Sequence, residues 1–363
     1  MNQHIHGGDI YRHPDLLDFS ANINPLGTPA SVIEAAGRGL KMIRNYPDVQ
    51  KEALIKALTA YEHVPESYII CGNGAAELVF SLVWALKPRR ALMAVPTFAE
   101  YEQALEAAEC EIEEYLLKEE NGFGLGEDFP ERITGETDIV FLCNPNNPTG
   151  VLIPDNLIDE ILERCRRHHV FLVLDECFTD FLENPELATK KGKLSEYPDF
   201  FILKAFTKRY AMAGLRLGYG LCSNPDLLEH MRRMTQPWNI SIPAQEAGVA
   251  ALKEEDYVNK ARKLTARERI WLKEELCKLD MKVYDSQANY IFFRGPGGLA
   301  GAVMDHGVMI RDCSNYQGLP EGYYRTAVRL HEENRKLIRA VRAALKDLDQ
   351  KPPALRETEN GRN

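Results

Sequence analysis

The stretch FFILKAFTKRYAMAGLRLGY occupies residues 200–219 of the chain. It opens with a continuous apolar run, which is typical of a strand buried on both faces of a parallel sheet. Thr207 and Lys208 follow this run, and Arg216 precedes the next one. A lone lysine in a loop is usually a solvated charge, but here a hydroxyl and a guanidinium accompany it, and both can hold a phosphate group. The stretch therefore predicts a sheet strand with an anion-binding site beyond its end.

Comparable apolar runs alternate with amphipathic helical stretches from Tyr68 to about Leu228. This alternation is the pattern of a parallel sheet covered by crossover helices, so we expect a large α/β domain. Its predicted strands span residues 68–71, 91–95, 138–142, 170–174, 200–203 and 217–221. A long helical region follows, and then come apolar runs at 281–284, 290–293, 308–311 and 324–328 and a last helix at 332–348. These later runs predict a small α+β domain.

The domain organisation expected from these patterns has four parts. They are an N-terminal arm at 1–48, a large domain at 49–260, a small domain at 261–348 and a disordered polar tail at 349–363. The arm has too little patterned sequence to fold alone, so we expect it to pack on the small domain or on a neighbouring subunit. The tail begins where Pro352 and Pro353 block continuation of the last helix.

Composition narrows the class of partner. The chain has 363 residues with 54 acidic and 44 basic side chains, a net charge of −10, which opposes nucleic acid or an anionic membrane as the main partner. No apolar stretch reaches the roughly 18 to 20 residues needed to cross a bilayer, and the N-terminus lacks the features of a signal peptide. We expect a cytoplasmic enzyme that binds a small molecule.

The eight cysteines contain no Cys-x-x-Cys pair, which argues against a structural zinc site and a disulfide framework. We expect reduced, mostly buried thiols. His4 and His6 have no third ligand nearby in sequence, so no metal site is expected. Short basic runs such as Lys190-Lys191 are interpreted as solvated faces.

Ligands of an open parallel sheet bind beyond the carboxyl ends of its strands. After the first predicted strand, Gly72 and Gly74 allow a sharp turn that exposes a helix N-terminus, which suits a phosphate, although simple chain reversal explains one such turn equally well. The loop at 144–150 presents three asparagines between two prolines. Asp175 ends another strand, where its carboxylate can hold a pyridinium nitrogen protonated or merely cap a helix.

In this order and spacing, the segments NPNNPTG (144–150), DE (175–176), TK (207–208) and GLRLGY (214–219) resemble the pyridoxal 5′-phosphate (PLP)-dependent class I/II aminotransferases of fold type I. The resemblance implies a large domain with a mostly parallel, seven-stranded type of sheet. It also implies that the cofactor is joined covalently to Lys208, that Asp175 pairs with its ring nitrogen and that Asn147 bonds its phenolic oxygen. The expected phosphate-binding residues are Gly74, Ala75, Thr207 and Arg216, and Phe98 is expected to stack on the ring.

Within that superfamily the chain is most similar to L-threonine-O-3-phosphate decarboxylases of cobalamin biosynthesis, with histidinol-phosphate aminotransferases next. The likeness rests on residues 6–10, 17–27, 45–48, 98–101 and 310–316. Two positions depart from many relatives: Ala205 replaces a Ser or Thr, and Phe178 replaces a Tyr that bonds the phenolic oxygen. Phe178 fits the decarboxylases better than the aminotransferases.

The resemblance also implies a substrate and a reaction. Arg311 and Arg325 would bind the anions of a small phosphorylated amino acid, with His6 and Asn22 completing the pocket. Tyr46 would reach the cofactor phosphate of a neighbouring subunit, which implies a homodimer with shared active sites. The expected reaction is loss of CO2 from L-threonine O-3-phosphate to give (R)-1-amino-2-propanol O-2-phosphate.

Three alternatives remain for the function. The main one is a histidinol-phosphate aminotransferase. Such an enzyme would use the same cofactor-binding residues and would differ from a decarboxylase only in which bond of the substrate is aligned for cleavage. L-serine O-phosphate is a second possible substrate, since a pocket for one methyl group discriminates by only about 1 to 3 kcal/mol. A PLP-binding regulator is disfavoured, because no segment is spare for a DNA-binding module. A nicotinamide-dependent enzyme is disfavoured too, because the glycines at 122–126 lack the required spacing and, with Glu119 beside them, indicate a surface turn.

Overall fold

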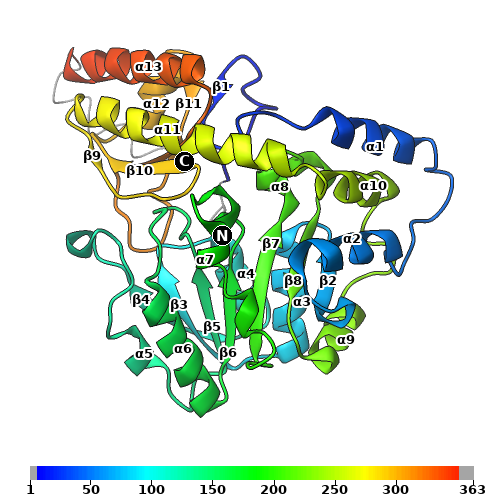
Figure 1. The fold of residues 1–363 in the computed structure, drawn as a ribbon. Coiled ribbons are helices and arrows are strands. Elements are labelled where there is room, and N and C mark those ends of the chain that lie inside the picture. Colours follow the sequence, from blue (N-terminus) through cyan, green and yellow to red (C-terminus); the bar gives the residue numbers. More distant parts are fainter. Residues whose placement is uncertain (1–5, 351–363) are drawn as a thin grey trace.

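The computed structural model describes residues 6–350, and it contains a large α/β domain with a smaller domain beside it (Figure 1). The large domain is built on a seven-stranded sheet with the order β2-β8-β7-β6-β5-β3-β4. Only β8 runs opposite to the common direction of the other six strands, so the expected mostly parallel sheet is confirmed. The strands are β2 (Ile69–Gly72), β3 (Arg90–Val95), β4 (Glu111–Leu116), β5 (Ile139–Cys143), β6 (Phe171–Asp175), β7 (Phe200–Ala205) and β8 (Gly218–Leu221).

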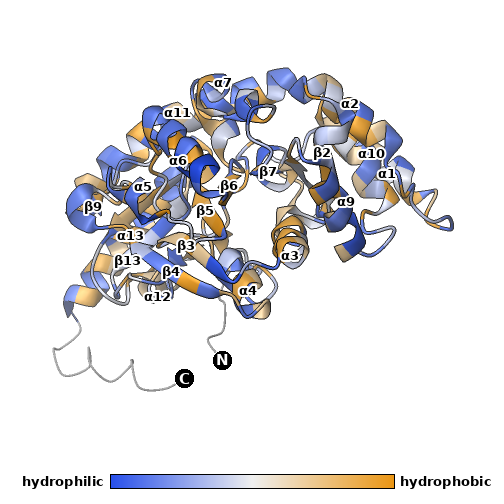
Figure 2. Ribbon diagram, turned by 90° about the horizontal axis from the view of Figure 1, so that it is seen from below, coloured by the Kyte–Doolittle hydropathy of each residue, from blue (hydrophilic) through white to orange (hydrophobic). Residues whose placement is uncertain are grey.

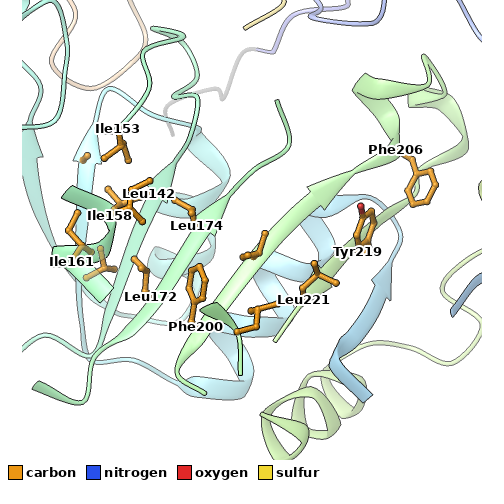
Figure 3. Close-up of a cluster of buried hydrophobic side chains, with 14 of the residues drawn as sticks. Leu142, Ile153, Ile158, Ile161, Leu172, Leu174, Phe200, Phe206, Tyr219 and Leu221 are labelled. Carbon is orange, nitrogen blue, oxygen red and sulfur yellow. The ribbon is translucent and has the colours of Figure 1, made fainter. Parts of the chain in front are cut away.

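Helices cover both faces of this sheet, which is why its central strands are apolar at every position. Leu172 and Leu174 of β6 pack with Ile158 and Ile161 on one face (Figure 3), and Val173 belongs to the core on the other face. In Figure 2 the central strands are mainly hydrophobic, whereas the outer helix α6 shows hydrophilic residues. The helices of this domain are α2 (Glu52–Glu62), α3 (Ala75–Leu86), α4 (Ala99–Ala107), α5 (Phe129–Arg132), α6 (Asp155–His168), α7 (Pro185–Ala188), α8 (Phe206–Arg209), α9 (Pro225–Met234) and α10 (Ile242–Ala251).

The smaller domain is a four-stranded antiparallel sheet with the order β12-β13-β10-β9 and a core of its own. Its strands are β9 (Lys282–Val283), β10 (Tyr290–Arg294), β12 (Arg311–Asp312) and β13 (Tyr323–Ala327), and its helices are α12 (Leu299–Met304) and α13 (His331–Gln350). Helix α11 (Glu255–Cys277) runs unbroken along both domains (Figure 1), so the expected boundary at residue 260 falls inside it.

The arm meets both domains. Its short strand β1 (Leu17–Asp18) pairs in parallel with β11 (Val308–Met309) of the small domain. Helix α1 (Ala30–Leu40) then packs on α10 of the large domain, where Gly39 lies so close that a Cβ would stand 2.7 Å from the Cα of Pro243. Residues 1–5 and 351–363, which include His4 and most of the predicted tail, lie outside the described residues.

Several expectations differ from the structure. Strand β4 was not predicted, because its sequence EIEEYL is interrupted by acidic residues instead of being apolar. Such acidic side chains are tolerated in β4 because it is an edge strand in contact with solvent. The long helical region divides into α10 and α11. Lys190 and Lys191 are not solvated: Lys190 is buried with its amine 2.6 Å from Asp155 and 2.7 Å from Asp159, and Lys191 pairs with Glu62.

All eight cysteines are free thiols, and Cys277 alone among them is exposed. Among residues 6–350 no helix combines the length and apolarity that a membrane span requires. The same described residues contain no group of three or more histidine, cysteine or acidic side chains placed to hold a metal ion.

Glu119 corrects the interpretation of residues 119–126 as a simple surface turn. Its carboxylate accepts hydrogen bonds from the amine of Lys282 and the hydroxyl groups of Tyr284 and Tyr323, each at 2.7 Å. These donors belong to the small domain, so the carboxylate ties the two domains together. The bond from Lys282, followed by those from the two tyrosines, lowers the pKa of Glu119 to about 2.

We expect Glu119→Gln to lower the free energy of unfolding at pH 7 by about 1 to 2 kcal/mol, because three bonds to a charged acceptor become weaker ones to a neutral amide. A carboxylate with a lowered folded-state pKa stabilises the fold above its usual pKa of 4.5 and loses that contribution as the pH falls towards 2. Denaturant titrations should therefore show a difference from wild type that shrinks between pH 5 and pH 3.

The control for this prediction is Glu120→Gln. Glu120 is the adjacent residue, is 73% exposed and lies 3.7 Å from Lys118. We expect a change within about 0.5 kcal/mol for this variant. Equal effects of the two substitutions would contradict the role assigned to Glu119.

Candidate active site

A cavity of about 1130 Å³ opens at the carboxyl ends of the central strands, between the large domain, the small domain and the arm. Most of the residues predicted for the site line it, although they come from distant parts of the sequence. They are His6, Asn22, Ala75, Phe98, Asn147, Asp175, Thr207, Lys208, Arg216, Arg311 and Arg325. Tyr46 does not line the cavity: it is 77% exposed and stacks on Trp238 with ring centroids 4.5 Å apart.

Lys208 lies on the short helix α8, which follows β7 directly, so its amine is delivered to the cavity by the end of a strand. The arm fixes this segment, because the backbone N–H of Asn24 donates to the carbonyl of Lys208 at 3.1 Å. Burial, together with the positive charge of Arg325, lowers the pKa of the Lys208 amine to about 8. A substantial fraction of the amine is therefore neutral and nucleophilic at mildly alkaline pH.

Asp175 ends β6 with a buried carboxylate. One oxygen accepts from the backbone N–H of Cys177 at 2.8 Å and the other from the hydroxyl of Tyr101 at 2.5 Å. Burial raises the pKa of Asp175, although both donors act in the opposite direction. A cationic ring nitrogen would satisfy this desolvated carboxylate. Tyr101 was not predicted as a site residue, although it lies in the segment 98–101 that carried part of the family resemblance.

The turn before α3 forms a cradle suited to phosphate. Gly74 has φ +82°, and a Cβ there would lie 2.4 Å from a guanidinium nitrogen of Arg216, so only glycine fits. Gly218 is equally constrained, because its Cβ would meet the backbone nitrogen of Ala75 at 2.4 Å. Helix α3 begins at Ala75, and its free N–H groups lie at the cavity together with Thr207.

Arg325 joins three separate segments. Its guanidinium donates to the side-chain oxygen of Asn147 and, at 2.8 Å, to the backbone carbonyl of Ser20. Its Nε is buried without a hydrogen-bond partner among the described residues, as is the Oδ1 of Asn22. Because Arg325 occupies the oxygen of Asn147, the amide nitrogen of Asn147 is the end left for a ligand oxygen.

Arg311 is buried on the small-domain side of the cavity, where it donates to Asn315 Oδ1 at 2.6 Å and lies 5.3 Å from the ring centre of Tyr316. Glu100 also lines the cavity, although sequence reasoning did not assign it to the site. One of its oxygens lies 3.8 Å from Nδ1 of His6. Burial raises the pKa of Glu100 to about 7.

The residues present fit PLP. The buried carboxylate of Asp175 would be stabilised by a cation such as a protonated ring nitrogen. The turn at Gly74 and the side chain of Arg216 offer hydrogen-bond donors to a phosphate. Lys208 supplies an amine of lowered pKa. The two departures noted in the sequence are compatible with this fit. Phe178 packs edge-on against Tyr290, whose hydroxyl is already bonded to the carbonyl of Asn146 at 2.7 Å. Ala205 also lines the cavity.

Comparison with known proteins agrees with this chemistry. The profile of the family described as aminotransferase class I and II matches residues 14–341. The threonine-phosphate decarboxylase of Salmonella typhimurium is 39% identical over 352 residues, covering 94% of this chain and 96% of that protein. The histidinol-phosphate aminotransferase of Methanosphaera stadtmanae is 30% identical over 338 residues, covering 90% of each.

Two of the solved structures that are similar to this chain carry the same two names. The histidinol-phosphate aminotransferase of Clostridium acetobutylicum superposes with a TM-score of 0.86 at 30% identity, covering 92% of this chain and all of that one. The L-threonine-O-3-phosphate decarboxylase of Porphyromonas gingivalis superposes with a TM-score of 0.81 at 25% identity, covering 90% of this chain and 99% of that one.

We expect Tyr101→Phe to weaken the binding of PLP about tenfold, because the buried carboxylate of Asp175 loses one of its two donors and becomes a poorer partner for a cation. Titration of the cofactor-free protein with PLP, followed by visible absorbance, measures this. The matched control is Tyr115→Phe, which removes a tyrosine hydroxyl bonded to Asp128 at 2.5 Å outside the cavity. The assigned role of Tyr101 is wrong if the two variants bind the cofactor equally well.

Proposed function

The chain belongs to the aminotransferase class I and II family of PLP-dependent enzymes, and we propose that within this family it decarboxylates L-threonine O-3-phosphate. The product would be (R)-1-amino-2-propanol O-2-phosphate, a precursor for cobalamin biosynthesis. The observation that carries the proposal is the 39% identity, over nearly the whole chain, with the threonine-phosphate decarboxylase of Salmonella typhimurium. The lower identity of 30% to a histidinol-phosphate aminotransferase makes transamination the competing function.

PLP, when bound, withdraws electrons from the substrate's Cα so that one bond to that carbon can break. Lys208 is the residue proposed to hold the cofactor covalently, and Asp175 would keep its ring nitrogen protonated. The amide nitrogen of Asn147 would donate to the phenolic oxygen, while Gly74, Ala75, Thr207 and Arg216 would bind the phosphate. Phe98 lines the same cavity and would stack on the ring.

Substrate anchoring decides which bond breaks. Arg311 and Arg325 are both buried and both line the cavity, so each can bind an anion away from competing water. We assign Arg325 to one anion of the substrate and Arg311, with His6, to the other, with Asn22 completing the pocket. Two fixed anions leave the substrate little freedom to turn. We propose that its phosphate is held so that the carboxylate, rather than the α-proton, is the group presented for cleavage. Lys208, or a water molecule, would return a proton to Cα.

We propose a cytoplasmic homodimer as the working form. Support for the dimer comes from the exposed apolar side chains around the end of α1, where Ile43 is 68% and Tyr46 77% exposed, and from Trp238 beside Tyr46. Within such a dimer Tyr46 would reach the cofactor phosphate of the second subunit. Eight free thiols suit a reducing compartment.

The substrate assay is decisive. Purified protein with PLP should release CO2 from O-phospho-L-threonine, and more slowly from O-phospho-L-serine, whose missing methyl group changes the specificity constant by roughly 10- to 100-fold. Lys208→Ala should lose both this activity and the visible absorbance of the bound cofactor. Amino transfer from glutamate to imidazole-acetol phosphate without CO2 release would instead establish the aminotransferase.

We expect Arg325→Lys to lower kcat/KM for O-phospho-L-threonine at least tenfold, about 1.4 kcal/mol, because lysine keeps the charge but cannot bond Asn147, Ser20 and a substrate anion as a fork. Steady-state kinetics measure the change. Arg335→Lys is the control, since Arg335 is 52% exposed on α13 and should give wild-type kinetics. Unchanged kcat/KM in the Arg325 variant would remove that residue from the substrate site.

A further inference from the structure

Glu100 is an acidic residue of the active-site cavity to which the proposed reaction gives no role. It lies in the first turn of α4, and its side chain is only 16% exposed. Its Oε2 is buried and has no hydrogen-bond partner among the described residues, while its Oε1 is 3.8 Å from Nδ1 of His6. Acidic residues are common in the first turn of a helix, but that role requires no buried oxygen without a partner. At the cavity, such an oxygen is available to a group that binds there.

The groups around Glu100 belong to both halves of the site. It interacts with Lys208 and Arg216, which are proposed to hold the cofactor, and with His6, which is proposed to bind the substrate. The titratable and charged groups that interact with it are His6 of the arm, Asp175 at the end of β6, Lys208 on α8, Arg216 before β8 and Tyr316. Arg311 lines the same cavity, as do Glu102 and Glu106 of α4, which also carries Tyr101. Burial outweighs the attraction of Lys208 and Arg216, so the pKa of Glu100 is raised to about 7.

We propose that Glu100 determines specificity for the substrate's phosphate group: its carboxyl group must take up a proton before the dianion binds, and it then donates a hydrogen bond to that dianion beside His6 and Arg311. An ionised Glu100 would repel the dianion, because charges near the protein interior are screened less than in bulk water. A protonated carboxyl group turns the buried, unpartnered oxygen into a donor.

Proton balance follows from this arrangement. One proton moves from solvent to Glu100 for each dianion bound when the pH exceeds the pKa of the empty site, and it leaves with the ligand. Below that pH the carboxyl group is already protonated, so binding takes up no proton. Affinity for a dianion should therefore fall by up to about tenfold per pH unit above pH 7 and be nearly constant below it. The identity of the substrate rests on the proposed function, but this linkage does not.

The test uses the PLP-loaded enzyme and inorganic sulfate, a dianion that does not itself titrate near neutral pH. Calorimetric titrations at pH 6 and pH 8, each in two buffers of different protonation enthalpy, give the affinity and the number of protons taken up. For wild type we expect uptake approaching one proton at pH 8 and little at pH 6. For Glu100→Gln, which is neutral at any pH, we expect no uptake, wild-type affinity at pH 6 and about tenfold tighter binding than wild type at pH 8.

The gain of affinity at pH 8 separates the proposal from a structural role. If Glu100 acted as a carboxylate that orients His6, Glu100→Gln would bind sulfate more weakly than wild type at both pH values, and the proposal would be overturned. Absence of sulfate binding to wild type, or of proton uptake at pH 8, would overturn it as well. Visible absorbance checks that each variant retains the cofactor.

The matched control is Glu106→Gln, which removes the same charge from the same helix at an exposed position near the cavity mouth. Solvent screens that charge, so the pH dependence of sulfate binding should match wild type. The assay with O-phospho-L-threonine is independent. If CO2 is not released but the proton linkage is present, the proposed function fails and the role of Glu100 stands. If CO2 is released without the proton linkage, the proposed function stands and the role of Glu100 is overturned.

Discussion

The buried guanidinium of Arg325 is the interaction on which the active site depends. Burying a charge is costly unless the charged group finds hydrogen-bond partners. Arg325 finds one partner in Asn147, in a loop of the large domain, and another in the carbonyl of Ser20, in the arm. These bonds hold three parts of the chain around one cavity. The same charge contributes to the lowered pKa of Lys208, so the electrostatics of the cofactor site depend on a residue of the small domain.

Much of the fold could be predicted because burial on both faces leaves a direct signature in the sequence. The runs that form β5, β6 and β7 are apolar at nearly every position, and each ends in the residues that reach the cavity. Strand β4 has no such signature, since one edge strand can remain acidic. Lys208 and Asp175 were recognisable as cavity residues for the same reason: both follow directly from the ends of buried strands.

The remaining site residues depend on contacts that no local pattern encodes. Tyr101 matters because its hydroxyl reaches Asp175 across 74 positions of sequence, and Glu119 because three donors of the small domain meet at its carboxylate. Lys190, next to another lysine, has the local sequence of a surface residue, yet two aspartates of α6 neutralise it in a buried position. In each case the partner, rather than the residue, determines the environment.

The pairing of β1 with β11 has a mechanical consequence. Backbone hydrogen bonds join this part of the arm to the small domain, whereas the backbone N–H of Asn24, six residues after Asp18, bonds the carbonyl of Lys208 in the large domain. Any movement of one domain relative to the other would therefore act on the short segment between Asp18 and Asn24, which contains Asn22. The arm thus links the two domains beside the cavity, which its residues Ser20, Ala21 and Asn22 help to line.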